Sequence, residues 1–208
     1  MTGEPFDNIA LYESYDLDLV ANMPITYAFK APELGVYEIA LTGKENELGI
    51  TLRAEALKGT SKQVTAQPSG TVYKNVNIIT GTSRMKEALI KFKVANSWLG
   101  SNNLAASDVK MLHWDGSQWT QLDTTQMTKD DTYTYYQAKT TALSPFAISG
   151  ITGGAAATTA TPMVTETQAM PTSTETPAPT TTNRIPGFEF VLTAGILSAA
   201  YLFGRKRR

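Results

Sequence analysis

Several short stretches of this chain alternate apolar and polar residues one for one, and this period restricts the fold more than any other feature. Successive side chains of an extended strand point to opposite faces, so such alternation is typical of a strand with one buried face. In residues 36–41 it places Tyr37, Ile39 and Leu41 together on one face. The clearest examples are residues 50–56, 90–94, 25–30 and 36–41.

The second half of the chain carries the same signal and a hairpin. Further strands are predicted at residues 109–114, 118–122, 132–138 and 145–149. Asp115 and Gly116 lie between the first two, and an Asp-Gly pair in that place is typical of a type I′ turn, because glycine tolerates positive φ. Alternation also sends Tyr133 and Tyr135 to one face and Tyr136 to the other, so at least one of these rings must point inward.

One segment departs from the strand pattern. Residues 96–104 suit a short helical turn capped by Asn96 or Ser97. The strands recur about every 8–12 residues, which is the spacing of two-sheet folds. We therefore expect a mainly β domain, an antiparallel β-sandwich (Ig-like or related) with one short helical turn.

The composition changes near residue 150 and again near residue 185, which divides the chain into three predicted pieces. Residues 1–150 mix aromatic, aliphatic and charged side chains, as a folded surface domain does. Residues 151–184 are about a third threonine and contain no aromatic residue. Such a segment buries too little apolar surface to offset its conformational entropy. We expect it to form a disordered Thr/Ala/Pro-rich stalk. Such a stalk is a common acceptor for O-linked sugars, and the alternative is an ordinary flexible linker.

The third piece, residues 185–208, has the pattern of a membrane anchor. Its apolar run at 188–204 would form a helix roughly 25 Å long, which suits a short single transmembrane span. Four cations follow the run directly, and such a cluster stays in the cytoplasm as a membrane stop. We therefore expect the domain and stalk to lie outside the cell membrane, at the cell surface. The stop residues are Arg205, Lys206, Arg207 and Arg208.

Charge and residue usage exclude several classes of protein. Without residues 205–208 and Glu189, the chain has 14 basic against 18 acidic residues, so its body lacks the basic face that nucleic-acid binding needs. The chain has no cysteine, which excludes disulfides, thiolate metal sites and cysteine nucleophiles. Its single histidine, His113, excludes mechanisms that need two imidazoles, including the usual zinc hydrolase sites.

No motif of a catalytic site is present. His113 lies within a predicted strand, and no serine stands in a recognisable nucleophile setting, so a structural histidine is favoured over a general base. We therefore expect no catalytic residue, no cofactor and a non-enzymatic protein.

Two acidic clusters are candidate calcium sites. The carboxylates of Glu13, Asp16 and Asp18 are predicted to alternate on one strand face, and Asp130 and Asp131 lie in a turn. Neither cluster has the ligand spacing of a calcium loop. Solvated faces are favoured, and no metal is expected.

The aromatic residues of the second half suggest a different chemistry. Trp98, Trp114 and Trp119 are the candidate platform for stacking a sugar ring. The alternative is that these rings fill the core and cap its ends. The residue pattern leaves both interpretations open.

The last 24 residues resemble the PGF-CTERM sorting signal of archaeal surface proteins. The resemblance rests on the threonine-rich stalk, the tripeptide Pro186, Gly187 and Phe188, the apolar run and the basic terminus, in that order. In that family a membrane transpeptidase, archaeosortase A, cuts near the tripeptide, and the new C-terminus is joined to a membrane lipid. The logic is that of other removable C-terminal signals. The alternative is a permanent anchor without cleavage.

Residues 12–150 also resemble the PGF-pre-PGF family, whose domain often precedes this signal. The resemblance implies a β domain displayed on the surface of archaea, with no known catalytic residues to carry over. The segments that carry it are residues 72–78, 92–99, 119–122 with Thr124, and 143–148.

The beginning of the chain departs from that pattern. Residues 1–8 are polar and lack the basic and apolar parts of a signal peptide, so we expect a fragment of a longer protein or a misassigned start.

The expected function is that of a non-enzymatic archaeal cell-surface protein, associated with the cell envelope or S-layer. Its expected partners are the membrane and archaeosortase A. One alternative is an adhesion or carbohydrate-binding module that uses the exposed tryptophans. The other is a surface hydrolase, which needs a pocket with His113 beside a serine and a carboxylate.

Overall fold

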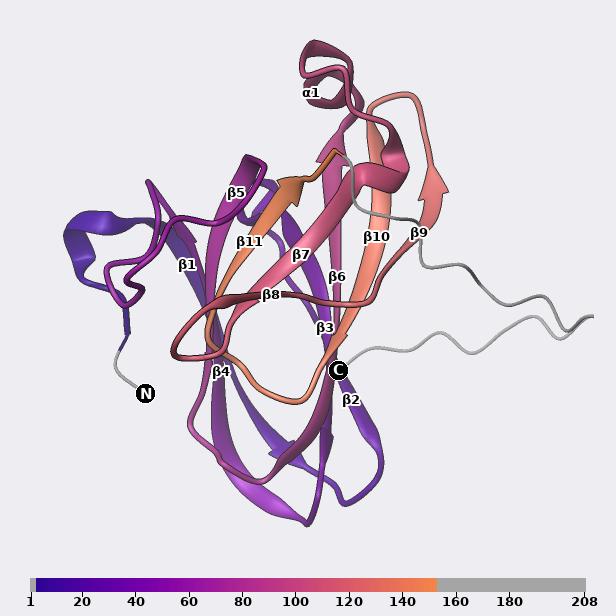
Figure 1. Ribbon diagram of the computed structural model, residues 1–208. Coiled ribbons are helices and arrows are strands. Elements are labelled where there is room, and N and C mark those ends of the chain that lie inside the picture. Colours follow the sequence, from indigo (N-terminus) through magenta and orange to yellow (C-terminus); the bar gives the residue numbers. More distant parts are fainter. Residues whose placement is uncertain (1–2, 153–208) are drawn as a thin grey trace, which may run out of the picture. The chain divides into compact units, whose positions relative to one another are not determined.

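The computed structural model describes residues 3–152 of the 208-residue chain. Within that range the backbone forms two antiparallel sheets (Figure 1). The first sheet has the order β1 (Ile9–Leu19), β4 (Glu47–Leu57), β5 (Thr71–Thr80), β11 (Pro145–Gly150), β7 (Val109–Trp114) and β8 (Trp119–Gln121). The second has the order β2 (Pro24–Ala28), β3 (Val36–Gly43), β6 (Met85–Ala95), β10 (Tyr133–Thr140) and β9 (Thr124–Lys129). Short helices are η1 (Phe6–Asn8), η2 (Pro32–Leu34), α1 (Asn96–Ser101) and η3 (Ala106–Asp108).

The two sheets share one hydrophobic core. Strand β6 shows how the sequence builds it, because Ile90, Phe92 and Val94 are buried while Lys91 and Lys93 are only half-buried. The prediction of a mainly β, antiparallel two-sheet domain with one short α-helix is therefore confirmed for this part of the chain. Inward-facing residues of the first sheet include Leu52, Ile78 and Ile148, and those of the second include Ile39, Phe92 and Tyr136.

The three tyrosines of β10 divide between the faces as expected. Tyr136 is 1% exposed and stacks on Phe92, with ring centroids 5.3 Å apart. Tyr133 and Tyr135 are half-buried on the opposite face. The prediction that one ring of this group points inward is confirmed.

A β-bulge corrects the prediction for β3. Val36 pairs with Phe92 and Glu38 pairs with Lys91, so Tyr37 is an extra residue in the ladder. The bulge puts Val36 in the core and turns Tyr37 away from Ile39. Tyr37 then lies edge-on to the ring of Tyr135, 5.7 Å away between centroids. The prediction that Tyr37 shares a face with Ile39 and Leu41 was wrong for this reason.

The hairpin of β7 and β8 is present, but its turn is shifted by one residue. The backbone N–H of Asp115 donates to the carbonyl of Gln118 at 3.0 Å, so the two central residues are Gly116 and Ser117. Of these, only Gly116 has positive φ, at 104°. A type I′ turn needs positive φ at both central positions, so the predicted turn type was wrong.

The helical turn is present at α1, but neither predicted cap holds its N-terminus. The capping position is Ala95, which has no side-chain hydrogen bond, and Asn96 is already helical. The Asn96 amide instead donates to the carbonyl of Asp130 at 2.8 Å and accepts from the Thr134 hydroxyl at 2.7 Å. Asn96 therefore ties α1 to the turn between β9 and β10.

Among residues 3–152, no helix has the length and apolar character to cross a membrane. Apart from Ile151 and Thr152, the predicted stalk at residues 151–184 lies outside the described residues, and so does the predicted anchor at residues 185–208.

Candidate functional site

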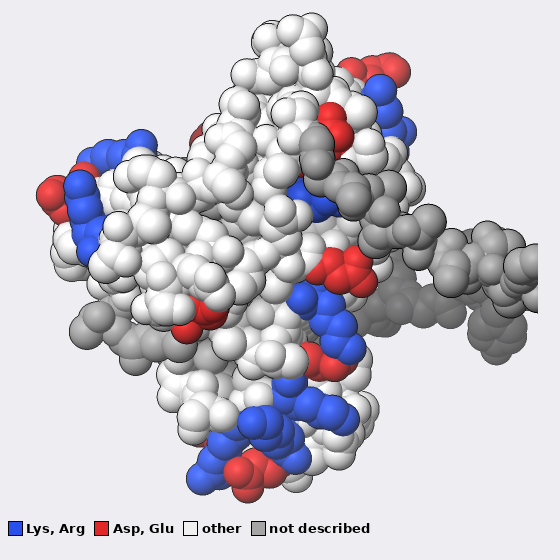
Figure 2. Space-filling view, in the orientation of Figure 1, with Lys and Arg blue, Asp and Glu red and all other residues white. Residues whose placement is uncertain are grey.

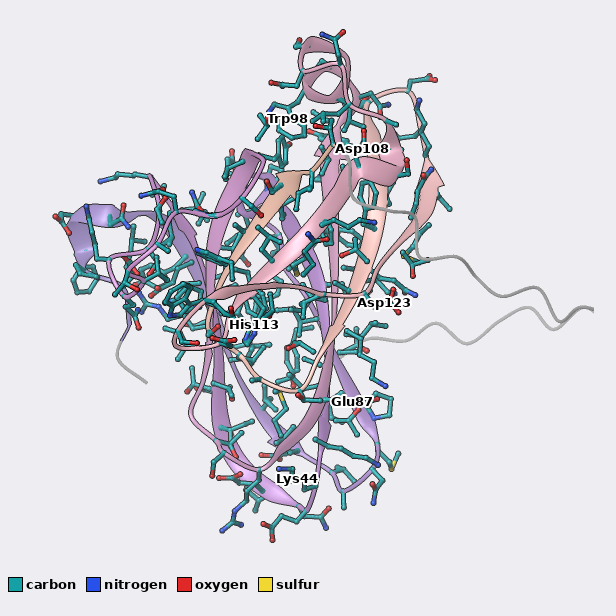
Figure 3. All side chains as sticks on the ribbon, viewed as in Figure 1. Lys44, Glu87, Trp98, Asp108, His113 and Asp123 are labelled. Carbon is teal, nitrogen blue, oxygen red and sulfur yellow. The ribbon has the colours of Figure 1, made fainter. Side chains whose placement is uncertain are left out.

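The structure separates the three tryptophans of the candidate platform. Trp98 lies on α1, where its ring contacts Tyr73 at a centroid distance of 4.9 Å. Trp114 and Trp119 pair across the β7–β8 hairpin, 5.5 Å apart. Figure 3 places Trp98 at the α1 end of the domain, well away from His113, the chain neighbour of Trp114. Trp114 is also only 5% exposed, so the three rings do not form one exposed platform, and Trp114 matches the alternative of a buried ring.

Trp114 instead forms a wall of a cavity of about 300 Å³ on the first sheet. The volume is at the lower end of the range for small-molecule pockets, which gives room for one small ligand. Four segments far apart in the sequence supply the lining: the β4–β5 loop (residues 58–70), β5, the β7–β8 hairpin, and the β10–β11 loop (residues 141–144) with the start of β11. We call this the β7 cavity. Its polar lining residues are Gln63, Asn77, His113, Asp115 and Ser144.

Two buried carboxylates fix the amide side chains of the β7 cavity. Glu55 lies on the outer face of β4 with no exposed surface, and its Oε2 accepts from the Asn77 amide at 3.0 Å. Arg53 also donates to Glu55, at 2.7 Å. Glu4, which is 4% exposed, accepts from the Gln63 amide at 3.4 Å. Each amide is thus anchored through its nitrogen, which leaves its carbonyl oxygen to face other partners.

Glu4 also closes the β4–β5 loop over the sheet. It accepts from the Ser61 hydroxyl at 2.6 Å, the Lys62 N–H at 2.6 Å and the Asn8 amide at 2.7 Å. Burial pushes the pKa of Glu4 upward, but these donors outweigh it and hold the pKa below its ordinary value of 4.5. The backbone N–H of Glu4 donates in turn to Glu55 at 3.2 Å. The segment before β1 is therefore part of the folded domain.

His113 is buried at the inner side of the β7 cavity. It is 8% exposed, and its ring lies 5.1 Å from that of Phe146. Burial lowers the pKa of His113, although nearby Asp115 opposes the shift, so the imidazole is neutral at pH 7. Its Nε2 atom has no hydrogen-bond partner within residues 3–152. The expectation of a strand histidine is confirmed, and it also lines a cavity.

Asp115 stands at the β7–β8 turn, beside the β7 cavity. Its Oδ1 accepts from the Gln118 N–H at 2.9 Å, from the Ser117 N–H at 2.8 Å and from the Ser117 hydroxyl at 2.8 Å. These bonds lower the pKa of Asp115 to about 2, so the carboxylate is ionised at neutral pH. Its Oδ2 remains a charged acceptor beside the cavity.

The serine of the β7 cavity is not paired with the histidine. The Ser144 hydroxyl donates to the carbonyl of Trp114 at 2.7 Å. A nucleophilic serine needs its hydroxyl on a base, so the bonding recorded here is that of a structural serine. The arrangement offers acceptors, donors and an aromatic wall for binding, and no activated nucleophile among its lining residues.

The predicted acidic clusters do not gather either. Asp16 and Asp18 are exposed, but Glu13 lies on the opposite face of β1, where its carboxylate accepts from the Lys30 N–H at 3.0 Å and the Tyr15 hydroxyl at 2.7 Å. The prediction that all three carboxylates share a face was wrong, because Glu13 differs from the other two in strand parity. No group of metal-ligating side chains occurs within the described range.

Asp130 closes the turn that precedes Tyr133. Its Oδ1 accepts from the N–H groups of Thr132 and Tyr133, both at 2.7 Å, and its Oδ2 accepts from the Tyr135 hydroxyl at 2.7 Å. These bonds hold the pKa of Asp130 below its ordinary value. The carboxylate therefore serves the turn, while Asp131 beside it is exposed.

Sequence reasoning missed the residues that support the β7 cavity. Alternation in residues 50–56 placed Glu55 on the polar face, and it does lie there, but the β4–β5 loop and the first residues cover that face. No local signal marks a polar residue that a distant loop will bury. The predicted sorting motif (Pro186, Gly187 and Phe188) and the stop residues (Arg205, Lys206, Arg207 and Arg208) lie outside the described residues.

Comparisons with known proteins give no match for this chain, either among protein families or among curated proteins.

Proposed function

We propose that this protein is a non-enzymatic archaeal cell-surface protein, a β domain displayed outside the cell and anchored through its C-terminus. In this proposal the domain is a β-sandwich, Ig-like or related, that belongs to the cell envelope or S-layer. It has the membrane and archaeosortase A as partners, and its C-terminus is cytoplasmic before processing.

One observation carries the proposal: the order of segments in the C-terminal quarter of the chain. Four segments follow one another there: a threonine-rich stretch, the tripeptide Pro186-Gly187-Phe188, an apolar run about long enough for a transmembrane helix, and a basic terminus. Each piece alone is common. Together they provide a spacer, a recognition site, a transient span and a charged stop, which is the logic of a removable C-terminal signal.

The folded domain is compatible with this proposal. Its cysteine-free core is held by packing and hydrogen bonds, so folding does not depend on the redox state of the compartment, outside the cell or inside it. Figure 2 shows that the charged side chains of one face gather towards its edges, with Lys and Arg concentrated at the end opposite α1, while much of its centre is uncharged. A binding module is therefore the second candidate function, favoured by the β7 cavity.

Intact mass spectrometry of the protein extracted from its native membranes tests the proposal. We expect loss of the residues after the Pro186-Gly187-Phe188 motif, together with an added lipid mass. Replacement of the three motif residues by alanine should leave a full-length chain, whereas Pro177→Ala in the stalk should be processed as the wild type is. A full-length wild-type chain that retains Arg208 would contradict processing.

A further inference from the structure

We propose that the β7 cavity is a binding site for one neutral saccharide unit. The inference goes beyond surface anchoring and rests on residues 3–152 alone. It assigns a ligand class to a site built from Gln63, Asn77, Trp114 and Asp115, and it replaces the three-tryptophan platform with a single pocket.

The lining combines a small apolar area with fixed hydrogen-bonding groups. Trp114, which is 5% exposed, contributes an apolar edge to the cavity wall, and Trp119 holds it in place by edge contact. Trp119 is fixed in turn, because its indole N–H donates to the carbonyl of Ala66 at 2.8 Å. The wall is therefore rigid before any ligand arrives, which lowers the entropic cost of binding.

The polar groups of the β7 cavity are equally well fixed. Glu55 and Glu4 hold the nitrogens of Asn77 and Gln63, so that the carbonyl oxygens of both amides are left as acceptors for sugar hydroxyls. Oδ2 of Asp115 adds a charged acceptor.

Charge selects a neutral ligand over an acidic one. Asp115 is the only charged residue in the lining, and its pKa of about 2 keeps it negative at neutral pH. A carboxylated sugar would place a second negative charge beside it without a cation in the lining to compensate. Glucose and glucuronate differ by such a group, so this pair reports the charge preference directly.

The β7 cavity lies at the start of β11. Strand β11 begins at Pro145, in the cavity wall, and ends at Gly150, beside Leu104 after α1. Its length is about 17 Å at the usual rise per residue.

Titration of the full-length protein with single sugars tests this inference. The chain is kept in a detergent without sugar head groups, and glucose, galactose, mannose, N-acetylglucosamine and glucuronate are added one at a time. Tryptophan fluorescence and the side-chain amide NMR signals of Asn77 and Gln63 report binding. We expect at least one neutral sugar to bind saturably with a dissociation constant on the order of 1 mM, and glucuronate to bind more weakly than glucose.

Three variants locate the site. Gln63→Ala removes one acceptor from an exposed loop and should weaken binding about three- to tenfold. Ala142→Trp places a ring in the mouth from an exposed position and should abolish binding. Gln126→Ala, exposed on β9 of the other sheet, is the matched control and should bind as the wild type does.

The inference is overturned by any of three results. These are a lack of saturable signal change with every neutral sugar, unchanged binding by Ala142→Trp, or tighter binding of glucuronate than of glucose. None of these results bears on how the C-terminus is anchored.

Discussion

At the scale of single residues, the domain depends on polar side chains that the hydrophobic pattern does not reveal. Glu4 and Glu55 are almost completely buried, and each is surrounded by donors. A buried carboxylate is tolerated only when its oxygens are paired, because the loss of its hydration is otherwise costly. The two carboxylates therefore stabilise the β4–β5 loop and, through it, one wall of the β7 cavity.

Replacement of Glu4 by glutamine should destabilise the domain by about 2 kcal/mol, because charged hydrogen bonds are lost and an amide N–H is set against other donors. Urea unfolding at neutral pH measures the change. Glu45→Gln is the control: Glu45 pairs with Arg84 at 3.2 Å in an exposed ion pair, and its loss should cost less than about 0.5 kcal/mol.

The effect of Glu4→Gln should also depend on pH. The folded pKa of Glu4 lies below its ordinary value of 4.5, so its contribution is complete above pH 4.5 and is lost as the pH falls through the folded pKa. The difference between wild type and variant should therefore shrink in acid. A difference that stays constant down to full protonation would contradict the assignment.

The stability of the domain should also depend on pH through His113. Near pH 6.5 no other side-chain type of this chain ordinarily titrates. Because its folded pKa lies below 6.5, the unfolded chain takes up the proton first, and stability should fall as the pH drops below 6.5. His113→Leu should abolish this slope. Unfolding midpoints measured between about pH 7.5 and 5.5 provide the comparison, and parallel curves for the two proteins would refute it.

At the scale of elements, two glycines differ in whether the surrounding structure leaves room for a side chain. Gly70 precedes β5 with φ of 78°, and a Cβ there would collide with the carbonyl oxygen of Gly150. Gly70→Ala should therefore cost about 2 kcal/mol or more. Gly100 lies inside α1 with open space around it, so Gly100→Ala should stabilise the domain by about 0.5–1 kcal/mol. Thermal unfolding of the two variants measures whether each substitution lowers or raises the stability, and equal effects of the two would contradict this account.

Strands with strict alternation were predictable, and irregular ones were not. Residues 90–94 lie within β6 because their period matches one buried face. Strand β9 escaped prediction because it is almost entirely exposed, and nothing in its pattern distinguishes it from a loop. The bulge at Tyr37 and the shifted turn at Gly116 depend on pairing partners that one strand's sequence does not specify.

At the scale of the whole molecule, the candidate site could be predicted only in part. The sequence analysis singled out Trp114, Trp119 and His113 as candidate site residues. Trp98, however, lies elsewhere, and the other walls of the β7 cavity come from distant segments of the chain. Gln63, Asn77 and Ser144 come together because β5, β11 and β7 are neighbours in the sheet. The order of the strands in the sheet cannot be predicted from the residue pattern of any single segment.

The claim that the domain stands on the outer surface of the cell has a direct test. Intact native cells are treated with a membrane-impermeant amine reagent, and the modification of Lys62, an exposed residue of the β4–β5 loop, is quantified by peptide mass spectrometry. We predict equal modification in intact and lysed cells, while a cytoplasmic marker is modified only after lysis. Modification of Lys62 that appears only after lysis would contradict surface display.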